Sequence, residues 1–174
     1  MRDGQGNWQA TFARDLGLLD GATLRRIQVL EPSVWWMATD RGVFRFQGGG
    51  LLDFNSARTD GGLPSDDVRT ILVTENRVFA GTAQGIGVLD LMENTWSQIG
   101  SESLGNLSVR SLALRDDDTL WVGTDRGLYK HALNGGDRVA FGLGNGLPDA
   151  RINDIALALD GRIYVATAGG VAHG

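Results

Sequence analysis

The sequence has no cysteine, only three prolines and a single lysine, Lys130. Without cysteine, the chain can form neither disulfides nor thiolate metal sites. No apolar run approaches the roughly 18–20 residues of a membrane-spanning helix, and the first residues lack the apolar stretch of a signal peptide. Sixteen basic and 21 acidic residues give a net charge of −5, which disfavours a nucleic-acid surface. We therefore expect neither membrane insertion nor a nucleic-acid partner.

Glycine, by contrast, is abundant, with 26 among 174 residues, and it follows no collagen-like period. Such a chain must turn often, because glycine is the residue that most easily adopts turn conformations. Hydrophobic residues make up 42% and charged residues 21% of the chain, which is the composition of an ordinary globular protein. The length suits one compact core, so we predict a single domain spanning residues 1–174.

Four segments of the chain are similar to one another. Each contains a threonine, and the four threonines, which are 43, 42 and 43 residues apart, are Thr39, Thr82, Thr124 and Thr167. The aromatic residues found three positions before them are Trp36, Phe79, Trp121 and Tyr164. The glycines found three positions after them are Gly42, Gly85, Gly127 and Gly170. A self-similarity of this period indicates a repeat architecture.

Each repeat divides into short strands. Aliphatic runs precede the aromatic residues at 24–30, 68–74, 109–114 and 152–159, and their length between turn signals is typical of buried strands. The strand with the aromatic follows, and the Thr-x-x-Gly turn leads into a third strand, where we expect the glycine conformation to be closed to other residues. More polar fourth strands end three of the repeats, at 51–54, 95–99 and 138–141. We expect an all-β fold in which the four aromatics pack between sheets.

The last repeat has no fourth strand of its own, and a strand at 7–12 precedes the first repeat. We predict that this N-terminal strand completes the last repeat and closes a ring, which hides the sheet edges. Four-stranded repeats of about 40 residues are β-propeller blades. The blades then cover approximately 24–54, 68–99, 109–141, and 152–174 plus 7–12. Four blades per chain are compatible with a four-bladed monomer and with an eight-bladed dimer that exchanges its N-terminal strands, and we favour the dimer.

The repeat motifs resemble the two-component regulator propeller repeat. The segments that carry the resemblance are GLPSDDVRTILV (62–73), DDDTLWVGTDRGLY (116–129) and GNGLPDARINDIALALDGRIYVATAGGV (144–171). They match the family pattern of a G-L-P loop, a V-R-x-I strand, an acidic turn, L-W-x-G-T and then x-x-G-[LV]. The resemblance implies a propeller from the sensor region of a membrane-bound signalling protein. On that basis the chain is extracytoplasmic if it is excised from such a sensor, and cytoplasmic if it is complete.

One set of side chains is a candidate ligand site. The second residues of the four innermost strands are Arg25, Arg69, Arg110 and Asn153. Innermost strands surround the axis of a propeller, so we expect these side chains to converge near one mouth of its channel. A guanidinium group binds carboxylate or phosphate with two hydrogen bonds, which predicts a small anionic ligand. Acidic neighbours such as Asp66 and Asp67 favour the alternative, in which the arginines form structural ion pairs between blades.

No catalytic or metal-binding motif accompanies this cluster. The two histidines, His131 and His173, are 42 residues apart, and no zinc, calcium or nucleophile-elbow spacing occurs. We expect no enzyme activity, no metal and no cofactor. The leading hypothesis is a non-catalytic binding or sensory propeller. The alternatives are a self-associating structural scaffold without a small ligand and, less favoured, a propeller lyase or lactonase.

Overall fold

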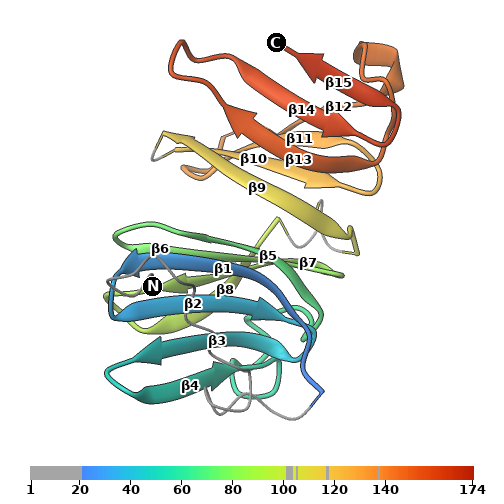
Figure 1. Ribbon diagram of the computed structural model, residues 1–174. Helices are drawn as coiled ribbons and strands as arrows, with labels where there is room; N and C mark the ends of the chain where they lie inside the picture. The colour runs from blue at the N-terminus through green and yellow to red at the C-terminus, as the bar shows by residue number, and fades with distance from the viewer. Residues whose placement is uncertain (1–20, 101–103, 105, 117, 137) are drawn as a thin grey trace, which may run out of the picture.

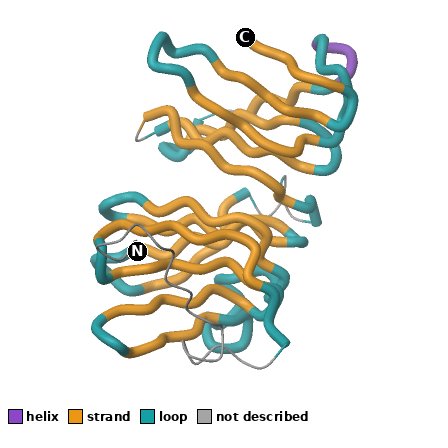
Figure 2. Tube along the Cα trace, viewed as in Figure 1, coloured by secondary structure: helices purple, strands orange, loops and turns teal. Residues whose placement is uncertain are grey.

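The computed structural model describes residues 21–100, 104, 106–116, 118–136 and 138–174. Within these ranges the fold is all β, and the only helical segment is a short 3₁₀ turn, η2 (Leu143–Asn145), drawn in purple in Figure 2. Three four-stranded sheets and one three-stranded sheet, all antiparallel, follow one another along the chain (Figure 1). Each sheet is one repeat, and each is a propeller blade.

The strands run in chain order from the inner to the outer edge of each blade. Blade 1 contains β1 (Leu24–Glu31), β2 (Val34–Thr39), β3 (Gly42–Gln47) and β4 (Gly50–Phe54). Blade 2 contains β5 (Val68–Val73), β6 (Arg77–Thr82), β7 (Gly85–Asp90) and β8 (Thr95–Ile99). Blade 3 contains β9 (Val109–Asp116), β10 (Thr119–Thr124), β11 (Leu128–Ala132) and β12 (Arg138–Phe141). Blade 4 contains β13 (Ile152–Leu157), β14 (Ile163–Thr167) and β15 (Gly170–His173).

The predicted strands agree with these boundaries to within two residues. The predicted fourth strands at 51–54, 95–99 and 138–141 are β4, β8 and β12, so the predicted all-β blade architecture is confirmed. The strand predicted at 7–12 lies outside the described residues. Closure of the last blade by that strand therefore stays a prediction.

The Thr-x-x-Gly turn has the same structure in every blade. In blade 1 the Thr39 hydroxyl donates to the carbonyl oxygen of Gly42 at 2.9 Å and accepts from the amide of Arg41 at 3.0 Å. The corresponding threonines of the other blades make the same two hydrogen bonds. The turn glycine has a φ of 112° in blade 1 and between 121° and 144° in the others. This is the left-handed region that disfavours other residues, as the sequence predicts.

The core lies between consecutive blades rather than within a single sheet. Trp36 of blade 1 and Ile71 of blade 2 belong to one buried cluster, and Trp121 of blade 3 and Ile155 of blade 4 belong to another. Phe79 of blade 2 belongs to the corresponding cluster with blade 3. These three aromatics are buried, whereas Tyr164 of blade 4 is 38% exposed. Tyr164 thus differs from the expectation for the aromatic column, because no described segment covers its face of blade 4.

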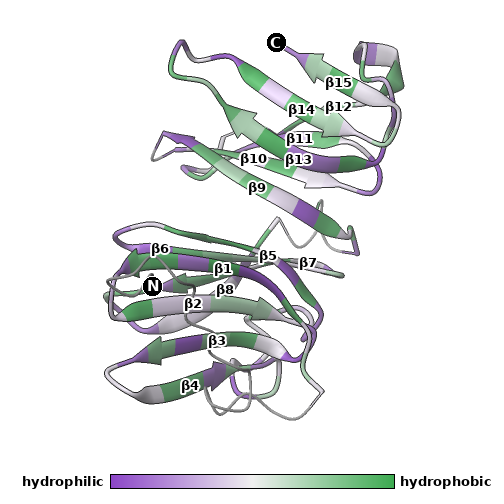
Figure 3. Cartoon of the chain, in the orientation of Figure 1, coloured by the Kyte–Doolittle hydropathy of each residue, from purple (hydrophilic) through white to green (hydrophobic). Residues whose placement is uncertain are grey.

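The innermost strands β1, β5, β9 and β13 contact one another in that order. The first and last blades lie at opposite ends of the array, at the bottom and the top of Figure 1. Hydrophobic residues are coloured on strands of both end blades, including β1, β14 and β15 (Figure 3). None of the described helical segments is long and apolar enough to cross a membrane.

Candidate functional site

The four predicted site residues occupy a β-bulge in each blade. Along the pairing of each innermost strand with the next strand, the register skips one residue after the first pair. The skipped residues are Arg25, Arg69, Arg110 and Asn153. A bulge leaves its extra residue out of the ladder and re-aims its side chain. The bulge therefore explains why this repeat position projects away from the sheet in every blade.

The structure brings these four residues together. Arg25, Arg69, Arg110 and Asn153 line one hollow with a volume of about 380 Å³. Three of the four carry a guanidinium group, which is protonated at any physiological pH and donates up to five hydrogen bonds. Among the lining residues none is acidic. The hollow is therefore a basic, hydrogen-bond-donating surface.

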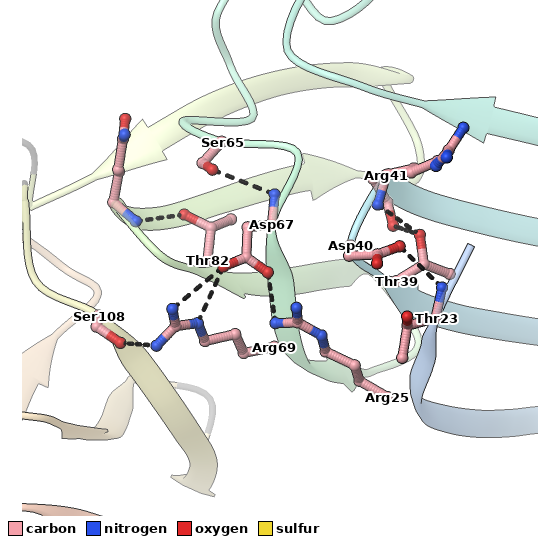
Figure 4. A network of polar contacts seen from close by, with 12 residues as sticks. Thr23, Arg25, Thr39, Asp40, Arg41, Ser65, Asp67, Arg69, Thr82 and Ser108 are labelled. Atoms are coloured by element: carbon pink, nitrogen blue, oxygen red, sulfur yellow. Dashed lines mark hydrogen bonds and ion pairs between the residues drawn. The ribbon is translucent and has the colours of Figure 1, made fainter. Parts of the chain in front are cut away.

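Asp67 balances part of this positive charge (Figure 4). Its carboxylate forms ion pairs with Arg25 of the preceding blade and with Arg69 of its own blade, the latter at 3.1 Å. The Arg69 guanidinium also donates to the hydroxyl of Ser108 in the following blade. The side chains of Arg25, Asp67 and Arg69 are 31%, 32% and 30% exposed, so solvent screens these pairs and their contribution to stability is modest. Arg25 thus joins neighbouring blades by an ion pair, and Arg69 joins them by a hydrogen bond.

The partners of these arginines occupy a second repeat position, two residues before the bulge. The residues at this position are Thr23, Asp67, Ser108 and Arg151. The bulge arginine of one blade bonds the residue at this position in the next blade, since Arg25 reaches Asp67 and Arg69 reaches Ser108. By the same rule Arg110 would turn to Arg151. The step from blade 3 to blade 4 thus places a cation where the two earlier steps have an oxygen acceptor.

The electrostatic environment of Arg110 reflects this cation in place of an acceptor. Burial lowers the pKa of Arg110, and the charges of Arg151 and Arg69 lower it further, against an opposing effect of Asp125. Its Nε is buried and has no hydrogen-bond partner among the described residues. No ion pair joins Arg110 to another residue in the described part of the chain. Arg151, like Arg110, forms no ion pair with a carboxylate of the described residues.

The sequence alone did not indicate the roles of Ser108 and Arg151. Both could have been found from the repeat alignment, because each lies two residues before a predicted innermost-strand residue, as Asp67 does. The missing signal was the direction of the contact. Only the structure shows that an arginine reaches forward to the next blade.

His131 lies apart from the hollow. It is on β11, two strands outward from β9, and pairs with Leu120 and Arg138 in the ladder. Burial lowers the pKa of His131, and the charge of Arg138 lowers it further. No group of three or more His, Asp or Glu side chains suited to a metal ion occurs among the described residues. The environment of His131 is that of a half-buried side chain in a sheet.

The lowered pKa of His131 predicts a pH dependence of stability. The unfolded chain takes up the proton near pH 6.5, the ordinary value, whereas the folded chain takes it up only at lower pH. The free energy of unfolding is then largest above pH 6.5 and falls as the pH decreases through the folded-state pKa. Urea denaturation between pH 8 and pH 5 measures this slope. His131→Gln should flatten the slope and His173→Gln should keep it; a slope unchanged in His131→Gln would contradict the assignment.

Known structures share this fold. No protein-family model matches the chain, and no curated protein matches it. The extracellular domain of a hybrid two-component system from B. thetaiotaomicron superposes with a TM-score of 0.73 and 24% identity over 87% of this chain. The extracellular domain of a second such system from the same organism superposes with a TM-score of 0.74 and 23% identity over 90% of this chain. An ancestral GH74 enzyme superposes with a TM-score of 0.69 and 17% identity over 88% of this chain.

This chain spans only part of each of these structures, covering 20%, 21% and 23% of their lengths. At these identities the likeness establishes the propeller fold. The two extracellular domains are consistent with the family indicated by the sequence motifs, since both belong to hybrid two-component systems. The chain is thus an array of β-propeller blades that resembles, in its repeat motifs and in its fold, the propeller domains of two-component regulators.

Proposed function

We propose that this chain is a non-catalytic binding module of a sensory propeller, and that its basic hollow takes a small anionic ligand. The observation that carries the proposal is the convergence of Arg25, Arg69 and Arg110 on one hollow from the same bulge position of three blades. The structural neighbours from two-component systems support a sensory role. They are extracellular domains, which supports an extracytoplasmic location for this chain as well.

The ligand binds on the side of Arg110 and Arg151. Asp67 already neutralises charge around Arg25 and Arg69, so these two guanidinium groups have less to gain from an external anion. Arg110 lacks such a partner and is partly desolvated, and a carboxylate or phosphate would relieve both its desolvation and its repulsion from Arg151. Asn153, on the adjoining blade, can donate a further hydrogen bond through its side-chain amide.

A propeller enzyme is the less supported function. Hydrolysis or elimination needs a group that takes up a proton near neutral pH, such as a carboxylate or an imidazole. The lining of the hollow consists of three guanidinium groups and one amide, and arginine stays protonated. The GH74 neighbour shares the fold at 17% identity and so does not transfer a catalytic role.

Blade 4, which carries Asn153 and borders this side of the hollow, has three strands in the described part of the chain. We propose that residues 7–12 supply the fourth strand of blade 4. In blades 1 and 3 the turn glycine lies against a fourth strand, because a Cβ built on Gly42 or Gly127 would fall 2.2 Å or 2.6 Å from a carbonyl oxygen of that strand. Gly170 has the same left-handed backbone, with a φ of 144°, but among the described residues a Cβ there would meet only Pro148, at 3.7 Å. The backbone of blade 4 is thus shaped for a strand beyond β15.

The anion proposal predicts a ligand-dependent thermal shift. Inorganic phosphate at 100 times its Kd adds about 2.7 kcal/mol to the free energy of unfolding, which raises Tm by roughly 5–10 °C for a domain of this size. Sodium chloride at matched ionic strength is the reference. Arg110→Ala should remove the shift, whereas Arg115→Ala, which deletes the same charge at the other end of β9, should retain it.

Stability without phosphate provides a second readout. Arg69→Ala should destabilise the protein, because it removes the contacts to Asp67 and Ser108. Arg110→Ala should leave stability unchanged or raise it, since it removes an unpaired, partly buried charge. If the native chain shows no phosphate shift, or Arg110→Ala keeps one, the anion site is refuted. A loss of stability in Arg110→Ala equal to that in Arg69→Ala would indicate a structural role instead.

A further inference from the structure

Every blade has two faces, and each interface joins one face of each kind. The forward face carries the aromatic column, Trp36, Phe79, Trp121 and Tyr164, and in blades 1 to 3 it packs on the following blade. The backward face carries the aliphatic residues at another repeat position, Ile27, Ile71, Leu112 and Ile155, and in blades 2 to 4 it packs on the preceding blade. The array therefore begins with one backward face and ends with one forward face that no described blade covers.

The forward face of blade 4 is exposed where its equivalents are buried. Val171 is 67% exposed, although the corresponding residues Val43, Ile86 and Leu128 are at most 4% exposed. Tyr164 of the same face is also exposed, unlike the aromatics of the other three blades. Exposed valine and tyrosine on a sheet face at positions that are core elsewhere in the molecule indicate a surface that is normally covered.

The backward face of blade 1 is exposed along β1. Ile27 is 48% and Val29 is 52% exposed, whereas Ile71 and Val73, their equivalents in blade 2, are buried. Met37 and Phe44 of the same face are buried, so the exposed part of this face is confined to the innermost strand. The equivalent strands β5, β9 and β13 provide the inner part of the backward face in the three interfaces within the chain.

The blades at the two ends of the array carry opposite charges at one repeat position. The residues directly after the bulge are Arg26, Thr70, Ser111 and Asp154. Between blades 3 and 4 the residues at this position touch, because the Ser111 hydroxyl donates to the carboxylate of Asp154 at 2.9 Å. One more interface of the same geometry would therefore place Asp154 of blade 4 against Arg26 of a first blade. Both side chains are exposed, and neither forms an ion pair within the described part of the chain.

We propose that the forward face of blade 4 packs against the backward face of blade 1 of a second copy, and that two such contacts close a ring of eight blades. The first and last blades of one copy lie at opposite ends of the array (Figure 1), so in this arrangement they do not reach each other. A contact between two different faces closes on itself when the rotation completes a ring. The new interface continues the three that the chain already contains, with apolar side chains and an Asp154–Arg26 pair.

Light scattering behind a sizing column tests the assembly on the 174-residue chain. The expected molar mass is twice the 18.6 kDa of one copy. A mass of 18.6 kDa, as for a four-bladed ring or a lone array that needs other blades, would overturn the proposal. So would any mass other than twice that of the chain, because an open chain of copies would not stop at two.

A charge exchange tests the orientation of the contact. Arg26→Glu sets two carboxylates against each other, and Asp154→Arg sets two guanidinium groups against each other. Each change should raise the dissociation constant of the dimer by more than about tenfold. The double variant should recover most of the native affinity, because the pair is restored with its signs reversed. Arg115→Glu, an exposed arginine on an inner blade, is the matched control and should remain dimeric.

Circular dichroism on each variant separates misfolding from dissociation. Singles that are folded and have the mass of one copy, together with a dimeric double variant, establish the contact. If a folded Arg26→Glu stays dimeric, or if the double variant is as dissociated as the singles, the Asp154–Arg26 interface is wrong. The anion site does not enter this test, since Arg110 and Arg151 are unchanged in every variant.

Discussion

Replacing Trp36 by alanine is expected to lower the free energy of unfolding by about 3–5 kcal/mol. Trp36 is 1% exposed in the interface between blades 1 and 2. Its ring stacks on Phe54 with centroids 6.0 Å apart, and the Arg45 guanidinium lies 5.4 Å from the ring centroid. Alanine would leave a cavity between two sheets that cannot move together without disturbing the neighbouring blades. Urea denaturation measures the loss, and a loss below about 1 kcal/mol would contradict this packing.

Tyr164 is the matched control at the same repeat position. It is partly exposed, and its ring centroid lies 5.8 Å from that of His173. In dilute protein Tyr164→Ala should therefore lower the free energy of unfolding by less than about 1.5 kcal/mol. In concentrated protein the cost should rise, because the second copy that we propose covers this face. A cost as large as that of Trp36→Ala at every concentration would mean that the face is covered within one chain.

Replacing Gly42 by alanine is expected to destabilise the protein by about 3 kcal/mol or more. Its φ of 112° lies in the region that residues with a Cβ avoid, and the added Cβ would fall 2.2 Å from the carbonyl oxygen of Phe54. That oxygen belongs to the main chain of β4, so relief requires the outer strand of blade 1 to shift.

Gly48 supplies the comparison for this change. Its φ is also positive, at 58°, but a Cβ there would meet no atom of the described residues within 4 Å. Gly48→Ala should therefore show only the backbone cost of about 1 kcal/mol. Thermal and urea unfolding of the two variants separate the steric contribution from the conformational one. Equal losses would show that the contact with β4 contributes nothing.

The blade architecture follows from the sequence because its causes are local. Thr39 and Gly42 define a turn by hydrogen bonds and backbone angles within four residues, and the turn recurs wherever the two residues recur. The short apolar run of β2 between two turns is likewise a signal from neighbouring residues. A repeat multiplies such local signals, so strand positions could be predicted to within two residues.

The candidate site could be predicted only in part. The convergence of Arg25, Arg69, Arg110 and Asn153 follows from the strand order alone. Their partners do not, because the contact of Arg69 with Ser108 spans 39 residues and depends on how two sheets are placed relative to each other. The exposure of Val171 was equally beyond prediction, since its repeat position is a core position in the other blades and only the arrangement of blades distinguishes it.

The bulge at the start of each innermost strand separates the residues needed for strand pairing from the residue that can contact a ligand. The bulged residue contributes no rung to the ladder, so its side chain can change without altering the register of the blade. A propeller built in this way can acquire a new ligand preference by single substitutions at one position per blade. The replacement of arginine by Asn153 in blade 4 shows that the position tolerates such a change. The inner rim of the array is thus a row of positions whose side chains can change while the strand register of each blade is kept.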